Sequence, residues 1–104
     1  MVPFKDFQKL EIKVGKILEV EDHPNADKLY LIKVDTGEER RIVAKIKSDY
    51  SKDELVGKKI IVLCNLEQMK IRGVLSEGML LAAEDKIVSL LTVDKDIKEG
   101  SKIS

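Results

Sequence analysis

Short apolar segments with the spacing of β-strands make up most of this chain, and nothing in it resembles a long helix. In the first segment Ile12, Val14, Leu18 and Val20 share one phase of a two-residue alternation, which is typical of a strand. The second and fourth segments are apolar on both faces, which indicates burial on both sides. The predicted strands are residues 11–22, 28–35, 39–46, 58–65 and 79–84.

Turns and two short helices complete the predicted order. Residues 3–10 repeat large apolar side chains at threes, with proline in the first turn, and Ser51 and Glu54 fit a capping box that Gly57 soon ends. Gly15 indicates a bulge or a bend at a barrel corner. A helix between the third and fourth strands favours an all-β OB-fold, the partly open five-stranded Greek-key barrel, over the competing SH3-like barrel.

Length and composition indicate a single domain over residues 1–104. The barrel is predicted over about residues 11–84, followed by a β-like C-terminal extension over about residues 86–104. A composition of 43% hydrophobic and 37% charged residues excludes a disordered chain. No apolar run approaches the ~20 residues of a membrane helix, and no secretory signal is visible. With Cys64 as the only cysteine, we expect a cytoplasmic protein without an internal disulfide.

The charge distribution is less neutral than the total of zero. Residues 40–79 hold nine lysines and arginines against five acids, whereas residues 1–39 hold six lysines against nine acids. The middle third therefore has the composition of a basic face for an anion, although ordinary scatter over a solvated surface explains the same counts. The zero total argues against a non-specific nucleic-acid binder.

Catalysis is not expected. The chain has one histidine, His23, which the neighbouring proline and asparagine place in a turn or on the surface. There is no Cys/His cluster for a metal, no glycine-rich phosphate loop and no nucleophile motif. Cys64 lies in an apolar strand and is expected to be an inert core thiol. No cofactor and no metal site is predicted.

A binding site is expected on one barrel face, between the loops that follow the first and fourth strands. In residues 65–78, Lys70 and Arg72 flank Ile71, so an extended chain places both cations on one side and Ile71 on the other. Lysine and arginine bind phosphates, and Asn65 and Ser76 add neutral hydrogen-bonding groups. A solvated loop whose glycines serve only turns is the alternative.

Two strings carry a family resemblance over nearly the whole chain. They are KLEIKVGKILEVEDHPNADKLYLIKVD and NLEQMKIRGVLSEGMLLAAED, and the combination of HPNADKL with the second string is specific. Together they resemble the small tRNA-binding domain family, which includes the C-terminal domain of methionyl-tRNA synthetase, stand-alone tRNA-binding dimers, a cytokine-like synthetase cofactor and a bacterial secretion chaperone. Relatives often carry glycine where Lys45 stands, and proline or an aromatic residue at Asp49.

The resemblance implies a non-catalytic OB-fold that binds tRNA by shape and backbone, and that raises the tRNA affinity of methionyl-tRNA synthetase in cis or in trans. A chaperone-like dimer that holds peptides is the alternative within the family. The family pattern falls on these candidate RNA contacts: Asn65, Lys70, Arg72, Ser76 and Met79, with Lys33, Lys45 and Lys47 as weaker candidates.

The C-terminal extension is predicted to form a homodimer, as the resemblance also implies. After the fifth strand the barrel is complete, so it offers little core for the apolar segment that follows. A two-fold interface covers such a segment with its own copy, and we expect Leu90 or Leu91 at its centre. A tail folded back on its own barrel is the alternative. The predicted interface residues are Ile87, Val88, Leu90, Leu91 and Val93.

Overall fold

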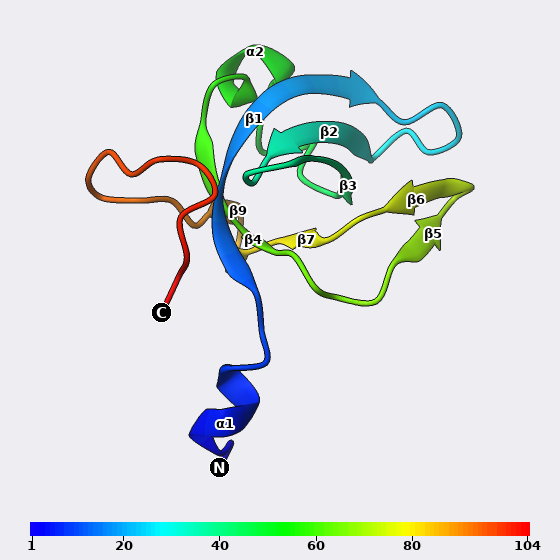
Figure 1. The fold of residues 1–104 in the computed structure, drawn as a ribbon. Coiled ribbons are helices and arrows are strands. Elements are labelled where there is room, and N and C mark those ends of the chain that lie inside the picture. The colour runs from blue at the N-terminus through cyan, green and yellow to red at the C-terminus, as the bar shows by residue number, and fades with distance from the viewer.

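The computed structural model describes all 104 residues and has the predicted all-β architecture. Its elements are α1 (Phe4–Phe7), β1 (Ile12–Asp22), β2 (Tyr30–Asp35), β3 (Glu39–Ala44), α2 (Lys52–Leu55), β4 (Lys59–Leu63), β5 (Met69–Ile71), β6 (Val74–Ser76), β7 (Met79–Leu80), β8 (Ala82–Glu84) and β9 (Val88–Leu90). Five strands form an antiparallel sheet in the order β3-β2-β1-β4-β7, which curls into a nearly closed OB-like barrel (Figure 1). The pairs β5–β6 and β8–β9 form separate hairpins.

Strand β1 belongs to both halves of the barrel, because its first half pairs with β4 and its second half with β2. Gly15 lies where the partner changes. A Cβ atom at this position would come within 2.6 Å of Cγ2 of Val34, so glycine is what permits the close approach. The register with β2 shifts farther along, between Ile17 and Glu19. Gly15 therefore marks the bend, and the irregular pairing follows it.

The barrel closes between β3 and the segment that joins β6 to β7. Val43 donates its backbone N–H to Oγ of Ser76 at 3.0 Å, and Glu77 donates its N–H to the Arg41 carbonyl at 2.8 Å. These two hydrogen bonds take the place of a regular β-ladder between β3 and this segment. The enclosed core consists of Ile17, Tyr30, Ile32, Val34, Ile42, Ala44, Ile46, Leu55, Ile60 and Val62.

Helix α2 closes one end of the barrel and begins with the predicted capping box. Oγ of Ser51 accepts the Glu54 N–H at 3.3 Å, while the Ser51 N–H donates to the Glu54 carboxylate at 3.0 Å. The hydrogen bonds from the Ser51 backbone and hydroxyl hold the pKa of Glu54 below its usual range. Leu55 is fully buried, so one apolar side chain anchors this single turn to the core.

Two features of residues 65–84 differ from the sequence prediction. The polar stretch predicted as a loop contains the β5–β6 hairpin. The predicted fifth strand, residues 79–84, is divided into β7, which pairs with β4, and β8, which pairs with β9. Between them, Leu81 donates its N–H to the Ile61 carbonyl at 2.9 Å, so the chain leaves the barrel sheet directly after this bond.

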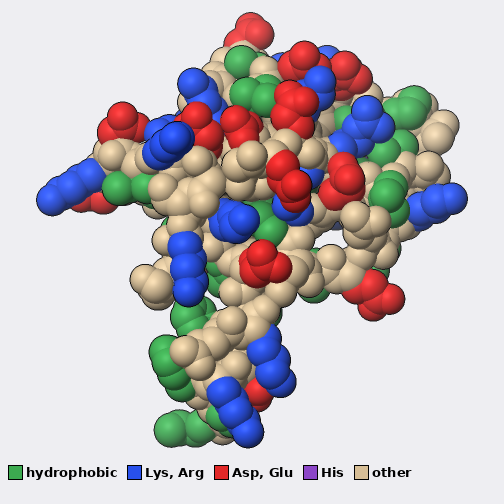
Figure 2. Space-filling view, viewed as in Figure 1, with side chains coloured by type: hydrophobic (Ala, Val, Ile, Leu, Met, Phe, Trp, Pro, Cys, Tyr) green, Lys and Arg blue, Asp and Glu red, His purple; other side chains and the backbone are tan.

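The N-terminal segment stands away from the barrel (Figures 1 and 2). Helix α1 is shorter than the predicted residues 3–10, and none of its residues is buried. The rings of Phe4 and Phe7 stack on each other with centroids 6.3 Å apart, and both remain exposed. Neither α1 nor α2 has the length or the apolar character to cross a membrane.

The C-terminal extension folds back on its own barrel in part. Val88 and Leu90 pack against the core, and their N–H groups donate to the Asp49 carboxylate at 3.2 Å and the Tyr50 hydroxyl at 2.9 Å. Residues 100–103 then return beside β1. Ile87 stays exposed.

Candidate nucleic-acid interface

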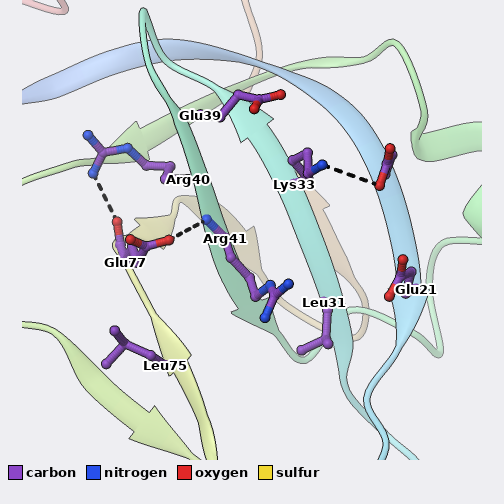
Figure 3. Close-up of a pocket in the computed structure, with 9 residues that line it drawn as sticks. Glu21, Leu31, Lys33, Glu39, Arg40, Arg41, Leu75 and Glu77 are labelled. Carbon is purple, nitrogen blue, oxygen red and sulfur yellow. Dashed lines mark hydrogen bonds and ion pairs between the residues drawn. The ribbon is translucent and has the colours of Figure 1, made fainter.

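A groove of about 370 Å³ lies on the outer face of β1, β2 and β3 and is bounded by β6 (Figure 3). Its apolar floor is formed by Leu31, which is buried, and Leu75, which is exposed. Charged side chains surround this floor. The remaining lining residues are Glu19, Glu21, Lys33, Glu39, Arg40, Arg41 and Glu77.

Most of the positive charge in the groove is already neutralised or bonded. Lys33 pairs with Glu19 at 3.6 Å. The side chain of Arg40 is only 12% exposed, and its Nη1 donates to the carbonyls of Cys64 at 3.0 Å and Glu77 at 2.9 Å. Figure 3 shows the remaining cation, Arg41, extending along β3 toward the floor. The groove is therefore acidic in balance and offers one uncommitted guanidinium.

The two loops that flank the groove are joined through His23, which lies directly after β1. The residue lies in the loop as expected, but it is only 4% exposed, so the alternative of a surface position is wrong. Nδ1 accepts the Asn25 N–H at 2.9 Å, and Nε2 lies 2.9 Å from the Ile71 carbonyl. An acceptor at Nδ1 assigns the proton to Nε2, which then donates to Ile71. The histidine thus connects the β1–β2 loop to β5.

Asn25 adds a second link between the same two segments. Its Nδ2 donates to the Arg72 carbonyl at 3.3 Å, at the tip of the hairpin. A turn residue and a buried ring therefore hold the hairpin beside the β1–β2 loop, and Figure 1 shows both projecting from the same side of the barrel. The HPN tripeptide was visible in the sequence, but its partners lie 47 and 48 residues away and no local pattern indicates them.

The tip of the β5–β6 hairpin is a two-residue turn formed by Arg72 and Gly73. Their φ angles are 55° and 90°, and two successive positive values are what a type I′ hairpin turn requires. The extended conformation predicted around Arg72 is therefore wrong, because this residue turns the chain. Lys70 on β5 and Arg72 at the tip are both exposed, while Ile71 is half-buried as expected.

Asn65 and Ser76, two predicted RNA contacts, use their polar atoms within the protein. Oδ1 of Asn65 accepts the Glu11 N–H at 2.8 Å, and its Nδ2 donates to the Lys9 carbonyl. Ser76 is buried, and its hydroxyl joins the β3 backbone to the Gly78 carbonyl at 3.0 Å. Ser76 therefore positions β6 against β3 beside the groove, whereas Asn65 holds the segment before β1 against the end of β4.

The other predicted RNA contacts differ in exposure and in whether they already form an ion pair. Lys45 is exposed and Met79 is 44% exposed. Lys47 pairs with Asp22 at 2.9 Å, and its ammonium lies 5.7 Å from the centroid of the Tyr30 ring. Lys52 also pairs with Asp22 at 2.8 Å, and the hydrogen bonds from Lys52 and Lys47 lower the pKa of the Asp22 carboxyl. No group of three or more His, Cys, Asp or Glu side chains is placed to hold a metal ion.

Residues 12–102 match the protein family described as "Putative tRNA binding domain". Methionine--tRNA ligase of Thermococcus onnurineus is 54% identical over 104 residues, which cover 98% of this chain and 14% of that protein. The corresponding ligase of Methanocaldococcus jannaschii is 57% identical over 99 residues, covering 92% and 15%. The chain thus spans only a small part of these curated relatives.

Solved structures match over the full chain. The CsaA chaperone protein of Picrophilus torridus superposes with a TM-score of 0.92 and 38% identity, covering 100% of both chains. A MetRS-related protein of Pyrococcus horikoshii also has a TM-score of 0.92, with 36% identity over 100% of this chain and 98% of that one. The fold and the sequence therefore point to the same group of proteins.

Proposed function

Because the chain belongs to the tRNA-binding domain family, we propose that it is a non-catalytic module that binds tRNA and raises the tRNA affinity of a methionyl-tRNA synthetase. The observation that carries the proposal is the β5–β6 hairpin, where Lys70 on β5 and Arg72 at the tip are exposed beside the groove, and where His23 joins the hairpin to the β1–β2 loop. Because the hairpin is bonded to the β1–β2 loop, its two cations are held in a fixed position at the edge of the binding face. The proposal implies a cytoplasmic location.

Each candidate residue has a role in this proposal. Lys70 and Arg72 contact phosphates, and exposed Met79 on β7 packs against a nucleotide. Lys45 adds an exposed positive charge for the RNA backbone, whereas Lys33 and Lys47 contribute only if RNA competes with their partners Glu19 and Asp22. Asn65 and Ser76 act as positioning residues through their internal bonds.

The experiment is filter binding of total tRNA to the wild type and to the double variant K70A/R72N. Asparagine suits a type I′ turn next to glycine, so R72N removes the charge while keeping the hairpin. We expect the dissociation constant to rise roughly tenfold. The slope of log K against log salt concentration (the salt slope) should become shallower by about 0.7 to 0.9 per lost phosphate contact. K95A/K98A removes two exposed tail lysines and serves as the matched control. A folded double variant with unchanged affinity and slope would exclude the hairpin as the RNA site.

The effect on the synthetase is tested in an aminoacylation assay. The chain, linked to or mixed with a methionyl-tRNA synthetase catalytic chain, is expected to lower KM for tRNA and leave kcat unchanged. Its contacts with tRNA stabilise the bound substrate and the transition state equally, so the barrier from the bound complex does not change. An unchanged KM with both arrangements would contradict the synthetase role, while tRNA binding by the isolated chain would stand.

A chaperone-like peptide-binding dimer is the second candidate function. It is supported by the likeness to the Picrophilus torridus CsaA chaperone and by the apolar floor of an acidic groove. Suppression of the aggregation of an unfolded protein, competed by peptide and not by tRNA, would favour it. Suppression abolished by tRNA would indicate one shared surface.

A homodimer completes the proposal. Its interface would use the exposed part of the C-terminal extension, Ile87 and Leu91, since Val88 and Leu90 already pack on the barrel of their own chain. Half-buried Val93 would lie at the margin of this interface.

A further inference from the structure

A second cavity, of about 410 Å³, lies between the end of the β1–β2 loop and the segment that follows β3. It shares no lining residue with the groove and has no apolar lining side chain. Its lining residues are Asp27, Lys28, Lys45, Lys47 and Ser48. Two segments distant in sequence thus bring three lysine side chains around one space.

The positive charge around this cavity is compensated only in part, by Asp27 in the lining and by Asp22 beside Lys47. Of its three lysines, only Lys47 takes part in an ion pair, and the contacts of that ammonium with Asp22 and the Tyr30 ring hold it in place. Lys28 and Lys45 are exposed and lack a carboxylate partner. Like charges gathered around one space repel one another, and an anion relieves this repulsion.

The groove offers an anion less available positive charge than this second cavity, which we call the lysine cavity. Four of the groove's nine lining residues are glutamates, and of its three cations Lys33 is paired and Arg40 is bonded within the protein. The lysine cavity has three lysines and one carboxylate. A phosphate group is therefore expected to favour the cavity, while the apolar floor of the groove suits a less charged part of the same ligand.

We propose that the lysine cavity binds a backbone phosphate of RNA and that the Asp27 carboxylate accepts a hydrogen bond from a neighbouring ribose 2′-hydroxyl. Lysine ammonium and serine hydroxyl groups are common phosphate donors, and Ser48 supplies the latter. A carboxylate on the wall of a phosphate site repels the ligand unless the ligand brings a donor to it. Ribose has that donor and deoxyribose lacks it, so the cavity discriminates RNA from DNA. This inference rests on the proposed tRNA-binding function.

The lysines are tested with K28A/K45A in tRNA filter binding across a range of salt concentrations. We expect roughly tenfold weaker binding and a salt slope shallower by about 1.5, for two lost phosphate contacts. Both side chains are exposed, so the melting temperature should match that of the wild type and of the control K95A/K98A. A folded variant that binds tRNA with wild-type affinity and slope would overturn the cavity alone. A wild type that does not bind tRNA would overturn the proposed function.

Asp27 is tested by the ratio of affinities for an RNA hairpin and a DNA hairpin of the same sequence. Loss of one hydrogen bond to a charged group should lower this ratio about tenfold in D27A. An unchanged ratio would refute the ribose contact. Titration of the wild type with ribose 5-phosphate, followed by NMR, examines the cavity without tRNA. We expect the amide signals of residues 27–28 and 45–48 to shift, and shifts confined to other residues would contradict the site.

Discussion

At the scale of the residue, His23 joins two segments that are otherwise separate in the sequence. Replacement by alanine leaves the Ile71 carbonyl and the Asn25 N–H without partners in a partly buried place and empties the space of a buried ring. We expect a loss of roughly 1–3 kcal/mol in the free energy of unfolding, measured by urea denaturation, together with weaker tRNA binding. In H23Q the side-chain amide reaches the Ile71 carbonyl and should recover part of both losses. Equal losses in H23A and H23Q would contradict a role for this hydrogen bond.

Asp22 gives a prediction about pH. The bonds with Lys52 and Lys47 lower its pKa in the folded protein below the ordinary value of 3.8. Since the folded pKa is the lower one, the contribution of Asp22 to stability is complete above pH 3.8 and is lost as pH falls through the folded pKa. The melting temperature of D22N should therefore be below that of the wild type near pH 7, and the two should converge in acid.

A second carboxylate serves as the control for this measurement. Glu84 is exposed on β8 and forms no ion pair, so E84Q should differ little from the wild type at any pH. A D22N difference that stays constant between about pH 6 and pH 2 would show that the two ion pairs contribute nothing.

At the scale of the element, the strength of the periodic pattern decided what the sequence could predict. β1, β2, β3 and β4 were predicted because their apolar side chains repeat over five or more residues and enter one core. The capping box of α2 was predicted from Ser51 and Glu54, because both partners lie within one turn. The β5–β6 hairpin was missed, since each strand has three residues and its turn is Arg-Gly rather than the usual Asn-Gly.

The division of residues 79–84 was also beyond the sequence pattern. Residues 79–83 are all apolar, so no period marks the point at which the chain leaves the barrel. That point is set by the Leu81 bond to β4 and by the later pairing of β8 with β9. In the candidate site, the cations were predictable as residue types. Their ion pairs and the burial of Ser76 and His23 depend on contacts across the barrel.

The hairpin turn gives a prediction about local order. Gly73 has a φ of 90°, a conformation that an L side chain adopts only with strain, and a Cβ there has no close contact. G73A should therefore destabilise the hairpin through its backbone, by about 1 kcal/mol or more, with little effect on the barrel. Hydrogen exchange should accelerate at the paired amides of β5 and β6 and stay unchanged in β1. The faster exchange should be accompanied by weaker tRNA binding. If the β5 amides of G73A keep the wild-type protection from hydrogen exchange, the strain argument is contradicted.

At the scale of the whole molecule, several exposed apolar side chains lie in the two terminal segments, outside the barrel. Ile87 is 64% exposed and Leu91 42% exposed in the C-terminal extension, and Phe4 and Phe7 are exposed on the projecting helix α1. The barrel itself buries its strand side chains efficiently. A chain that hides one set of apolar groups and leaves another in water is typical of a protomer with a further interface. A two-fold axis covers such a patch with its own copy.

The oligomeric state is therefore the test at this scale. We expect sedimentation equilibrium of the wild type at micromolar concentration to give twice the chain mass of 11.7 kDa. I87D/L91D should give the single-chain mass and keep the fold, because both side chains are exposed and a charge there costs little in the monomer. V88A is the control: Val88 packs against the core, so this variant should lose roughly 1 kcal/mol of stability and remain a dimer. A wild type that sediments as a monomer would contradict the interface. It would favour the alternative in which the tail only folds back on its own barrel.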